Sequence, residues 1–484
     1  MQLPGLNLTN ENALWLLSIV WTLYVVIVGV WILLQRSAPV ATLSWLLSMA
    51  AIPVGGLAIY YFFGPQRFKR QRIKHLRARK SARVRASVQR MRERMPADAE
   101  RLHQVARLIN ATSDFPVSTA TDLQLLVGGA ATYEAISTAV RAARHHVHLE
   151  YYIFEPDSTG TALRDLLVEK ARTGVEVRLL VDALGSKRLG KRFLKPLLEA
   201  GAEVALFHDA RVGRRLRPVI NFRTHRKILI CDGLVGFTGG VNVTDEENVN
   251  VMPDAYHDVH LRLEGAVVNW LQIVFLEDWA YALDKLPQSP PEDLELLLPE
   301  VGDGHLPMQV ITSGPDNGLQ AIYRAHLAAI NAAEQRVWLT TPYFVPTEAA
   351  LAALTNAALR GVDVQLLVPY KSDSALVTAA ARSYFDELIR CGVRVYEYKA
   401  RMLHSKTLVV DDGMAIIGTP NFDYRSFFLN YEVCVIAYGP VLNRDLAAQF
   451  ETDLQQAQRV HYKRRQGFAQ RLFDSAARLC SPLL

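Results

Sequence analysis

Two short stretches of the chain carry a histidine, a lysine and an aspartate at the same spacing. They read RTHRKILICD at residues 223–232 and LHSKTLVVDD at residues 403–412. Counted from the histidine, both copies also have a glycine at position +14 and an asparagine at position +17. The repeated polar positions are His225, Lys227, Asp232 and Asn242 in the first copy, and His404, Lys406, Asp411 and Asn421 in the second.

The chemistry that fits this set is transfer of a phosphodiester group. Two lysines and two asparagine amides would hold the non-bridging oxygens and stabilise the extra charge of a pentacovalent transition state. One imidazole attacks phosphorus, and the other protonates the leaving alkoxide and then activates the incoming nucleophile. A single motif would favour an ordinary buried histidine on a strand, but two matched copies favour catalysis. No acidic cluster with metal-ligand spacing accompanies the motifs, so no metal or other cofactor is expected.

Four further acids have expected roles. Asp232 and Asp411 complete the motifs and are counted with the catalytic set, although their position at strand ends favours turn capping first. Each catalytic imidazole also needs an acceptor to fix its other ring nitrogen. We expect Glu432, at position +28 from His404, to orient that histidine, and Asp258, at position +33 from His225, to orient the first.

The elements that position these residues are also duplicated. Helix, strand, helix, strand, helix and strand follow one another in residues 135–207 and again in residues 322–398, with helices predicted to end at Gly174, Gly201, Gly361 and Gly392. This alternation predicts an α/β fold of two similar halves with largely parallel sheets. Packing of the halves about a pseudo-twofold axis would bring both motifs to one cleft. The predicted halves span 115–285 and 306–484, joined by a connector at 286–305 that is rich in proline and acid.

The N-terminal part predicts a membrane anchor. Residues 13–34 contain no charge and are long enough to cross a bilayer, and a second uncharged stretch at 38–63 would cross with a kink or enter as a hairpin. We assign residues 1–65 to this anchor and 66–114 to a basic juxtamembrane linker. Within the linker, Arg67–Arg94 carries a net charge of +12, against +6 for the whole chain. Beside hydrophobic segments such a run favours anionic lipid headgroups over nucleic acid and places the globular part in the cytoplasm.

The paired motifs resemble those of the phospholipase D superfamily. Within it, NFRTHRKILICDGLVGFTGGVN, HSKTLVVDDGMAIIGTPNFDYRSFFLNYEV and the membrane segment APVATLSWLLSMAAIPVGGLAIYYFFGPQR are similar to bacterial cardiolipin synthases, over nearly the whole chain. The resemblance implies transfer of a phosphatidyl group between two phosphatidylglycerols through a phosphohistidine, in a multi-pass protein of the bacterial inner membrane. It also implies that His225 is the nucleophile and His404 the general acid. Residues implied to contact the lipid headgroup are Arg223, Arg425 and Ser426.

Other readings use the same site. A hydrolase of the phospholipase D or endonuclease type would take water as the acceptor, although a nuclease has no need of membrane segments. A related transferase would use another lipid pair, for example phosphatidylethanolamine with phosphatidylglycerol. A lipid-binding scaffold would leave the paired histidines unexplained. The sequence leaves the oligomeric state open.

Overall fold

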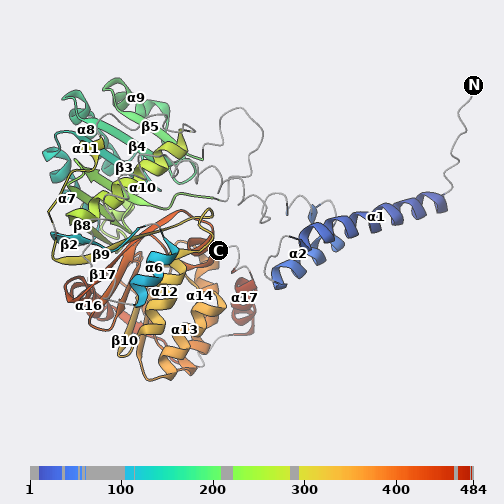
Figure 1. Cartoon of the computed structure of the whole chain (residues 1–484). Coiled ribbons are helices and arrows are strands. Elements are labelled where there is room, and N and C mark those ends of the chain that lie inside the picture. The colour runs from blue at the N-terminus through green and yellow to red at the C-terminus, as the bar shows by residue number, and fades with distance from the viewer. Residues whose placement is uncertain are drawn as a thin grey trace, which may run out of the picture. The chain divides into compact units, whose positions relative to one another are not determined.

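The computed structural model describes residues 10–34, 39–52, 55–56, 60, 104–113, 115–208, 222–283, 294–302, 304–462, 467–479 and 481. It divides into two compact units, one of residues 1–71 with 215–221 and one of residues 72–214 with 222–484. The basic run Arg67–Arg94 lies outside the described residues. Figure 1 shows the helices and strands of both units.

The N-terminal unit contains α1 (Asn10–Leu33) and α2 (Pro39–Ala51). Ile32, Met49 and Tyr60 are buried where the two helices meet, and the ring of Tyr60 lies 5.0 Å from that of Trp45. Many other apolar side chains of this unit are exposed, including Trp15 and Ile27. Within the described residues, no helix combines the length and mean hydropathy expected of a membrane span.

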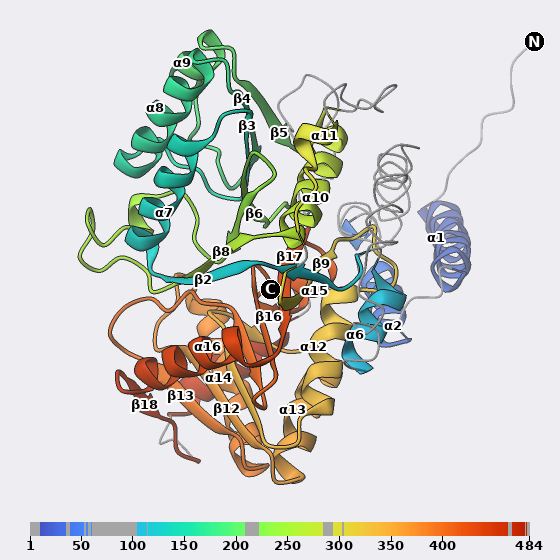
Figure 2. The same cartoon turned by 60° about the vertical axis from the view of Figure 1, so that its left-hand side comes forward.

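The larger unit is an α/β structure built on two sheets (Figures 1 and 2). The seven-stranded sheet has the order β2-β8-β7-β6-β3-β4-β5. Its strands are β2 (Asp122–Val127), β3 (His146–Tyr151), β4 (Glu176–Asp182), β5 (Glu203–Phe207), β6 (Lys227–Cys231), β7 (Val235–Gly239) and β8 (Val259–Glu264).

The nine-stranded sheet has the order β1-β9-β17-β15-β14-β10-β12-β13-β18. Its strands are β1 (Ser118–Ala120), β9 (Leu306–Ser313), β10 (Arg336–Thr340), β12 (Asp363–Pro369), β13 (Arg394–Tyr398), β14 (Thr407–Val410), β15 (Met414–Gly418), β17 (Glu432–Tyr438) and β18 (Ala457–Arg459). Two short strands, β11 (Phe344–Val345) and β16 (Phe422–Asp423), pair separately and in parallel.

The expectation of largely parallel sheets is wrong, because both sheets are mixed. Among the described strands of the two sheets, only β3, β4 and β5 in the first and β10, β12 and β13 in the second pair in parallel. These are the strands that alternate with helices, and such crossovers permit parallel pairing. Each motif strand instead begins a hairpin, β6 with β7 and β14 with β15, whose short turn forces antiparallel pairing.

Helices cover the sheets, and four of them end where the sequence predicts. Those of the first half are α7 (Gly129–Ala142), α8 (Ser158–Arg172), α9 (Lys191–Glu199) and α10 (Ala266–Ala282), followed by α11 (Leu294–Leu297). Those of the second half are α12 (Ala321–Ala332), α13 (Glu348–Leu359), α14 (Ala375–Arg390), α15 (Tyr424–Phe428), α16 (Pro440–Leu454) and α17 (Phe468–Leu479). The four glycines predicted just after helices all adopt positive φ, between 89° and 99°, which confirms those helix ends.

The two halves exchange segments. Helix α6 (Gln104–Thr112) supplies Val105, Ala106 and Ile109 to the core of the second half, and β1 pairs with β9. The first sheet therefore begins only at β2, later than the expected boundary at residue 115. In return, α16 of the second half packs against β2, which runs along the boundary between the halves in Figure 2. This exchange makes the halves one body around the motifs.

Candidate active site

The two motifs lie on equivalent central strands, with the histidine two or three positions before the strand and the lysine at or just before its start. Strands β6 and β14 are buried along their whole length because they run through the middle of each sheet. Lys227 Nζ donates to the backbone oxygen of His225 at 2.9 Å, and Lys406 Nζ makes the same contact with His404. Each ammonium group is therefore held beside the imidazole of its own motif.

The segments that carry the histidines pair with the opposite half. The backbone nitrogen of His225 donates to the oxygen of Tyr431 at 2.8 Å, and that of His404 donates to the oxygen of His257 at 2.7 Å. Both contacts belong to isolated parallel bridges, Thr224 with Tyr431 and Leu403 with His257. Because the same bridge occurs twice with the halves exchanged, the two histidines are related by the expected pseudo-twofold arrangement.

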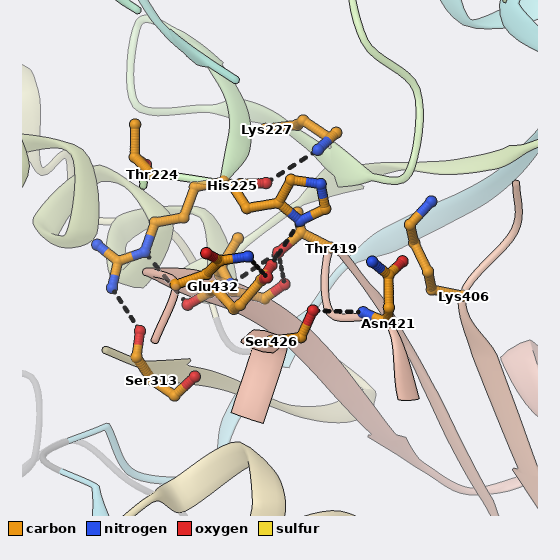
Figure 3. Close-up of polar contacts among 12 residues, drawn as sticks. Thr224, His225, Lys227, Ser313, Lys406, Thr419, Asn421, Ser426 and Glu432 are labelled. Atoms are coloured by element: carbon orange, nitrogen blue, oxygen red, sulfur yellow. Dashed lines mark hydrogen bonds and ion pairs between the residues drawn. The ribbon is translucent and has the colours of Figure 1, made fainter. Parts of the chain in front are cut away.

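These bridges decide which acid orients which histidine. Glu432 follows Tyr431 and places Oε2 2.9 Å from Nδ1 of His225, whereas Asp258 follows His257 and places Oδ2 2.6 Å from Nδ1 of His404. The expected pairing of each acid with the histidine of its own half is therefore wrong. The sequence distances of +28 and +33 were counted to the histidine of the same half. They differ because each acid contacts the histidine of the opposite half instead. Figure 3 shows His225 facing Glu432, with Thr419 beside the carboxylate.

Both acids are held as carboxylates. Although burial alone would raise its pKa, the contact with His225 holds the pKa of Glu432 below its usual value, and Thr419 Oγ1 donates to Oε2 at 2.5 Å. Lys406 and His404 likewise outweigh burial and lower the pKa of Asp258. A carboxylate only accepts hydrogen bonds, so each histidine carries its proton on Nδ1. Nε2 of each ring is then free to act on a substrate.

Burial dominates the cations and imidazoles of the site. It lowers the pKa of His225 to about 4 against the opposing effect of Glu432, and it also lowers the pKa of His404. Burial followed by the charge of Lys406 lowers the pKa of Lys227 to about 7. Two ammonium groups that disfavour each other's charge create a site that gains stability when it receives an anion.

The glycines and asparagines that follow the motifs shape the same region. A Cβ on Gly239 would lie 2.6 Å from Cα of His260, and one on Gly418 would lie 2.5 Å from Cα of Cys434, so only glycine lets these strands approach. Beyond them, the buried amides of Asn242 and Asn421 each keep an Oδ1 without a partner in the described part of the chain. Figure 3 shows Asn421 and Lys406 of the second half near His225 of the first.

Two residues at matching positions support the asparagines. Ser426 Oγ accepts from the backbone nitrogen of Asn421 at 3.1 Å, so this serine, expected at the headgroup, is a buried support instead. In the first half, Glu247 Oε1 accepts from the backbone nitrogen and Nδ2 of Asn242, at 3.1 and 2.9 Å. Burial and Asp258 raise the pKa of Glu247 to about 8. Sequence reasoning missed Glu247, although its position five residues after Asn242 matches that of Ser426.

Glu247, Asp258 and His404 are close enough to be considered as cation ligands, with one ligand atom of each within 4.8 Å of the others. However, Nδ1 of His404 faces Asp258, and Lys406 Nζ lies 3.6 Å from the same carboxylate. A cation at this position would have to break the hydrogen bond that orients His404. The donor set is therefore better suited to holding protons than to holding a metal.

The motif aspartates lie away from this chemistry. Asp232 and Asp411 end their strands with φ of 56° and 46°, about 16 Å along the strand from the lysines at about 3.3 Å per residue. Asp232 accepts from the backbone nitrogens of Arg144, His145 and His146 at 2.8, 2.8 and 2.9 Å. Asp411 accepts in the same way from Glu334, Gln335 and Arg336. This placement does not fit a catalytic role for Asp232 and Asp411. It fits the expected role of capping the turn at the end of each strand.

The expected headgroup arginines come together from opposite halves. Arg223 is buried with NH1 3.6 Å from Asp182, and burial, assisted by the charge of Arg425, lowers its pKa against the opposing effect of Asp182. Tyr152 lies beside the histidine, with its ring centroid 5.0 Å from that of His225 and 5.6 Å from Lys227 Nζ, and the charges of Arg425 and Arg223 both act on its phenol. Tyr152 was not among the residues that the sequence predicted for the site.

Comparison with known proteins agrees with this geometry. The family model described as "Cardiolipin synthase, PLD-like domain" matches residues 136–279 and 326–454. The cardiolipin synthase of Alkalihalophilus pseudofirmus is 37% identical over 481 residues, covering 97% of this chain and 94% of that protein. Cardiolipin synthase 1 of Bacillus anthracis is 35% identical over 490 residues, covering 99% and 96%.

A solved structure shares the fold at low sequence identity. The phosphatidylserine synthase of Haemophilus influenzae superposes with a TM-score of 0.59 at 15% identity, covering 79% of this chain and all of that one. The two family matches fall on the two halves that carry the motifs, and the similarity to the relatives extends over nearly the full length. The chain belongs to the cardiolipin synthase family of the phospholipase D superfamily.

Proposed function

We propose that the chain transfers the phosphatidyl group of one phosphatidylglycerol to the headgroup glycerol of a second, which yields cardiolipin and releases glycerol. The observation that carries this proposal is the pair of buried histidines, each held through Nδ1 by a carboxylate of the opposite half. Family membership over the full length supports the choice of lipids.

In the first step, Nε2 of His225 attacks the phosphorus of the donor lipid and a phosphorus–nitrogen bond forms. The bond from phosphorus to the glycerol oxygen breaks, and His404, which enters this step as an imidazolium protonated on both ring nitrogens, gives its Nε2 proton to that oxygen. Lys227 and Lys406 neutralise the non-bridging oxygens, whose charge increases in the transition state. Glu432 stabilises the positive charge that develops on His225 as it becomes a phosphohistidine.

In the second step, glycerol leaves and a second phosphatidylglycerol enters. His404, now unprotonated, removes the proton from the headgroup hydroxyl, whose oxygen attacks phosphorus. The phosphorus–nitrogen bond breaks, His225 is regenerated, and His404 holds the proton for the next cycle. Because His225 carries the phosphatidyl group between the two steps, His404 acts as general acid in the first step and as general base in the second.

The surroundings of the histidines support this division of roles. Nδ1 of His404 lies 2.6 Å from Asp258, whose charge stabilises an imidazolium, and 3.6 Å from Glu247, which adds a second negative charge when it loses its proton. Within the described part of the chain, His225 has the carboxylate of Glu432 alone. The histidine that can be charged most readily is suited to be the acid, and the other to be the nucleophile.

We also propose that the N-terminal segment holds the catalytic unit at the bacterial inner membrane, on its cytoplasmic side. Support comes from the uncharged residues 13–34, from exposed apolar side chains on α1 such as Trp15 and Ile27, and from the +12 charge of Arg67–Arg94. That residues 13–34 and 38–63 cross the bilayer stays a prediction, which labelling of single cysteines from either side of vesicles would test.

The function is tested by supplying the purified full chain with phosphatidylglycerol, with and without phosphatidylethanolamine, and identifying the products. We expect cardiolipin and glycerol in equal amounts. His225→Ala and His404→Ala should each lower the rate at least 10³-fold, whereas the exposed His305→Ala is the matched control and should not. Phosphatidic acid as the sole product would indicate a hydrolase, and a strict need for phosphatidylethanolamine would indicate a different lipid pair.

A further inference from the structure

The C-terminal helix α17 packs on the second half with its polar side inward. It lies beside α14 in Figure 1, and Asp474 and Ala477 are its buried residues, at 4% and 1% exposure. Gln470 Nε2 donates to Asp474 Oδ1 at 2.7 Å, and the guanidinium of Arg478 lies 3.4 Å from Glu387 of α14. A helix on the surface of a water-soluble domain normally buries its apolar side instead.

The apolar side of α17 faces outward. Phe468, Leu472, Phe473 and Leu479 are 81%, 59%, 48% and 83% exposed. At about 100° per residue, Phe468, Leu472 and Leu479 project within about 40° of one another, whereas Phe473 lies on the flank of the helix, about 100° from Leu472. Three large apolar groups kept in water on one helix face, with a fourth half exposed on its flank, indicate a surface that contacts something apolar.

The charge beside this face favours an anionic partner. Arg471 is exposed at its edge, and the sequence just before the helix reads Lys463-Arg464-Arg465. Residues 463–479 carry five basic side chains and one acid, a net charge of +4. Arginine and lysine flanking aromatic and leucine side chains are typical of helices that lie in a membrane interface. A second copy of the chain would set these like charges against each other in a twofold contact.

Packing beneath α17 connects this face to the active site. Ala477 is buried with Val377 and Ala380 of α14 and with Val345 of β11. Val345 pairs with Asp423, two residues after the site residue Asn421. A lipid surface held against α17 would therefore lie against the part of the fold that supports the second motif.

We propose that α17 is an interfacial helix through which the catalytic unit lies on the surface of an anionic phospholipid bilayer, with Phe468, Leu472 and Leu479 among the acyl chains. This contact is additional to the N-terminal anchor. This proposal rests on the proposed function, because it concerns how the same active site reaches lipids in a bilayer. Contact of the helix with lipid can nevertheless be measured without any catalytic turnover.

The first test uses the full chain in vesicles of phosphatidylcholine containing phosphatidylglycerol. A single cysteine at position 472, in a background with the native cysteines replaced by serine, carries a fluorophore, and the vesicles contain a quencher on the acyl chain. We expect strong quenching at 472 and little at 359, because Leu359 is equally apolar, 68% exposed and on another helix. Quenching at 472 should fall at least threefold in vesicles of phosphatidylcholine alone.

Equal quenching at the two positions would overturn the proposal, and quenching independent of phosphatidylglycerol would overturn its anionic preference. Disulfide formation between two copies at position 472 would identify a second chain as the partner and would also overturn it.

The second test is activity. The double variant Phe468→Gln with Leu472→Gln should form cardiolipin at least fivefold more slowly than the wild type in vesicles, and within twofold of the wild type in detergent micelles. The control variant Leu359→Gln should match the wild type in both vesicles and micelles. Equal loss in vesicles and micelles would mean that the helix only supports the fold. Absence of cardiolipin with the wild type would count against the proposed function and leave the quenching result intact.

Discussion

At the scale of single residues, burial determines the protonation of the catalytic groups more than their residue types do. His225, Lys227, His404 and Lys406 are all buried, and burial is the largest influence on the pKa of each. Four buried basic groups are stable together because Glu432 and Asp258 compensate part of their charge. A phosphodiester anion would compensate more, so binding of the substrate and protonation of the site are coupled.

The pKa of Lys227 gives a pH dependence. Because burial and Lys406 lower this pKa to about 7, the ammonium charge is present below pH 7 and lost above it in the free enzyme. We expect kcat/KM, which reports the free enzyme, to fall more steeply than tenfold per pH unit above pH 7, because Lys227 and the general acid His404, whose pKa is also lowered, both lose their protons. The fall in kcat should begin at higher pH, since the bound anion favours the charged lysine. Rates in mixed micelles at high salt, where the surface potential is screened, measure both.

That prediction separates Lys227 from an ordinary exposed lysine. If kcat/KM falls only tenfold per pH unit up to pH 9, as expected from loss of the His404 proton alone, the lysine keeps its usual pKa and the charge coupling between the two motifs is absent.

The crossed acids give a second prediction at this scale. With a phosphatidyl ester of p-nitrophenol, the leaving group needs no general acid, so attack by His225 alone sets the burst of p-nitrophenolate. Glu432→Gln should lower the burst rate about 10²- to 10⁴-fold, as expected when a histidine loses its orienting carboxylate. Asp258→Asn should lower it less than tenfold, because it acts on His404.

With phosphatidylglycerol, whose alkoxide must be protonated, both variants should be slow. The reverse order in the burst experiment would mean that His404 is the nucleophile. Equal effects would contradict separate roles for the two acids.

At the scale of elements, each motif is a strand that is attached at both ends. The start of the strand bridges to the other half, and its end is fixed by an aspartate that receives three backbone hydrogen bonds from the loop before β3 or β10. The spacing of seven residues between histidine and aspartate thus spans the strand together with its attachments at both ends. It sets where the histidine lies and contributes nothing to the reaction itself.

Asp232→Asn should therefore affect stability and not catalysis. The change keeps a residue that tolerates positive φ but removes a charge-assisted acceptor, which costs about 1–3 kcal/mol of unfolding free energy. Backbone hydrogen bonds outweigh partial burial and lower the pKa of Asp232, so its contribution is present above its unfolded pKa and is lost as pH falls through the folded value. Denaturant unfolding should show a smaller difference at pH 3 than at pH 7.

The surface pair of Asp122 with Arg262 provides the control for that measurement, since Asp122→Asn should cost under about 1 kcal/mol. A kcat of Asp232→Asn lowered more than tenfold at a temperature where the variant is folded would contradict the structural role.

The elements also show what the sequence could predict. Helix ends at four glycines, the duplicated order of elements and the gathering of both motifs follow from periodicity and spacing, which are local. The mixed pairing of the sheets, the partners of Glu432 and Asp258, and the role of Glu247 depend on contacts between residues far apart in the chain. Nothing local distinguishes an acid that reaches across the interface from one that stays in its own half.

At the scale of the whole catalytic unit, neither half contains a complete site. The first half holds His225 but not Glu432, and the second holds His404 but not Asp258. The second half also needs β1 and α6, which precede the first half in the chain. The reaction needs a nucleophile and a separate general acid and base. The duplicated fold supplies both, because each half provides one histidine and the acid that orients the histidine of the other half.

This division predicts the behaviour of a chain cut between residues 287 and 290, in the connector. Fragments 1–287 and 290–484, expressed together, should assemble through the bridges at Thr224 and Leu403 and keep at least a tenth of the activity of the intact chain. Each fragment alone should be inactive, because its histidine lacks the acid from the other. Activity of fragment 290–484 alone would mean that two copies pair and that Glu432 can orient His404. Glu432 could then take the place of Asp258 beside His404, and neither Asp258 nor Glu247 would be required for His404 to act as the general acid.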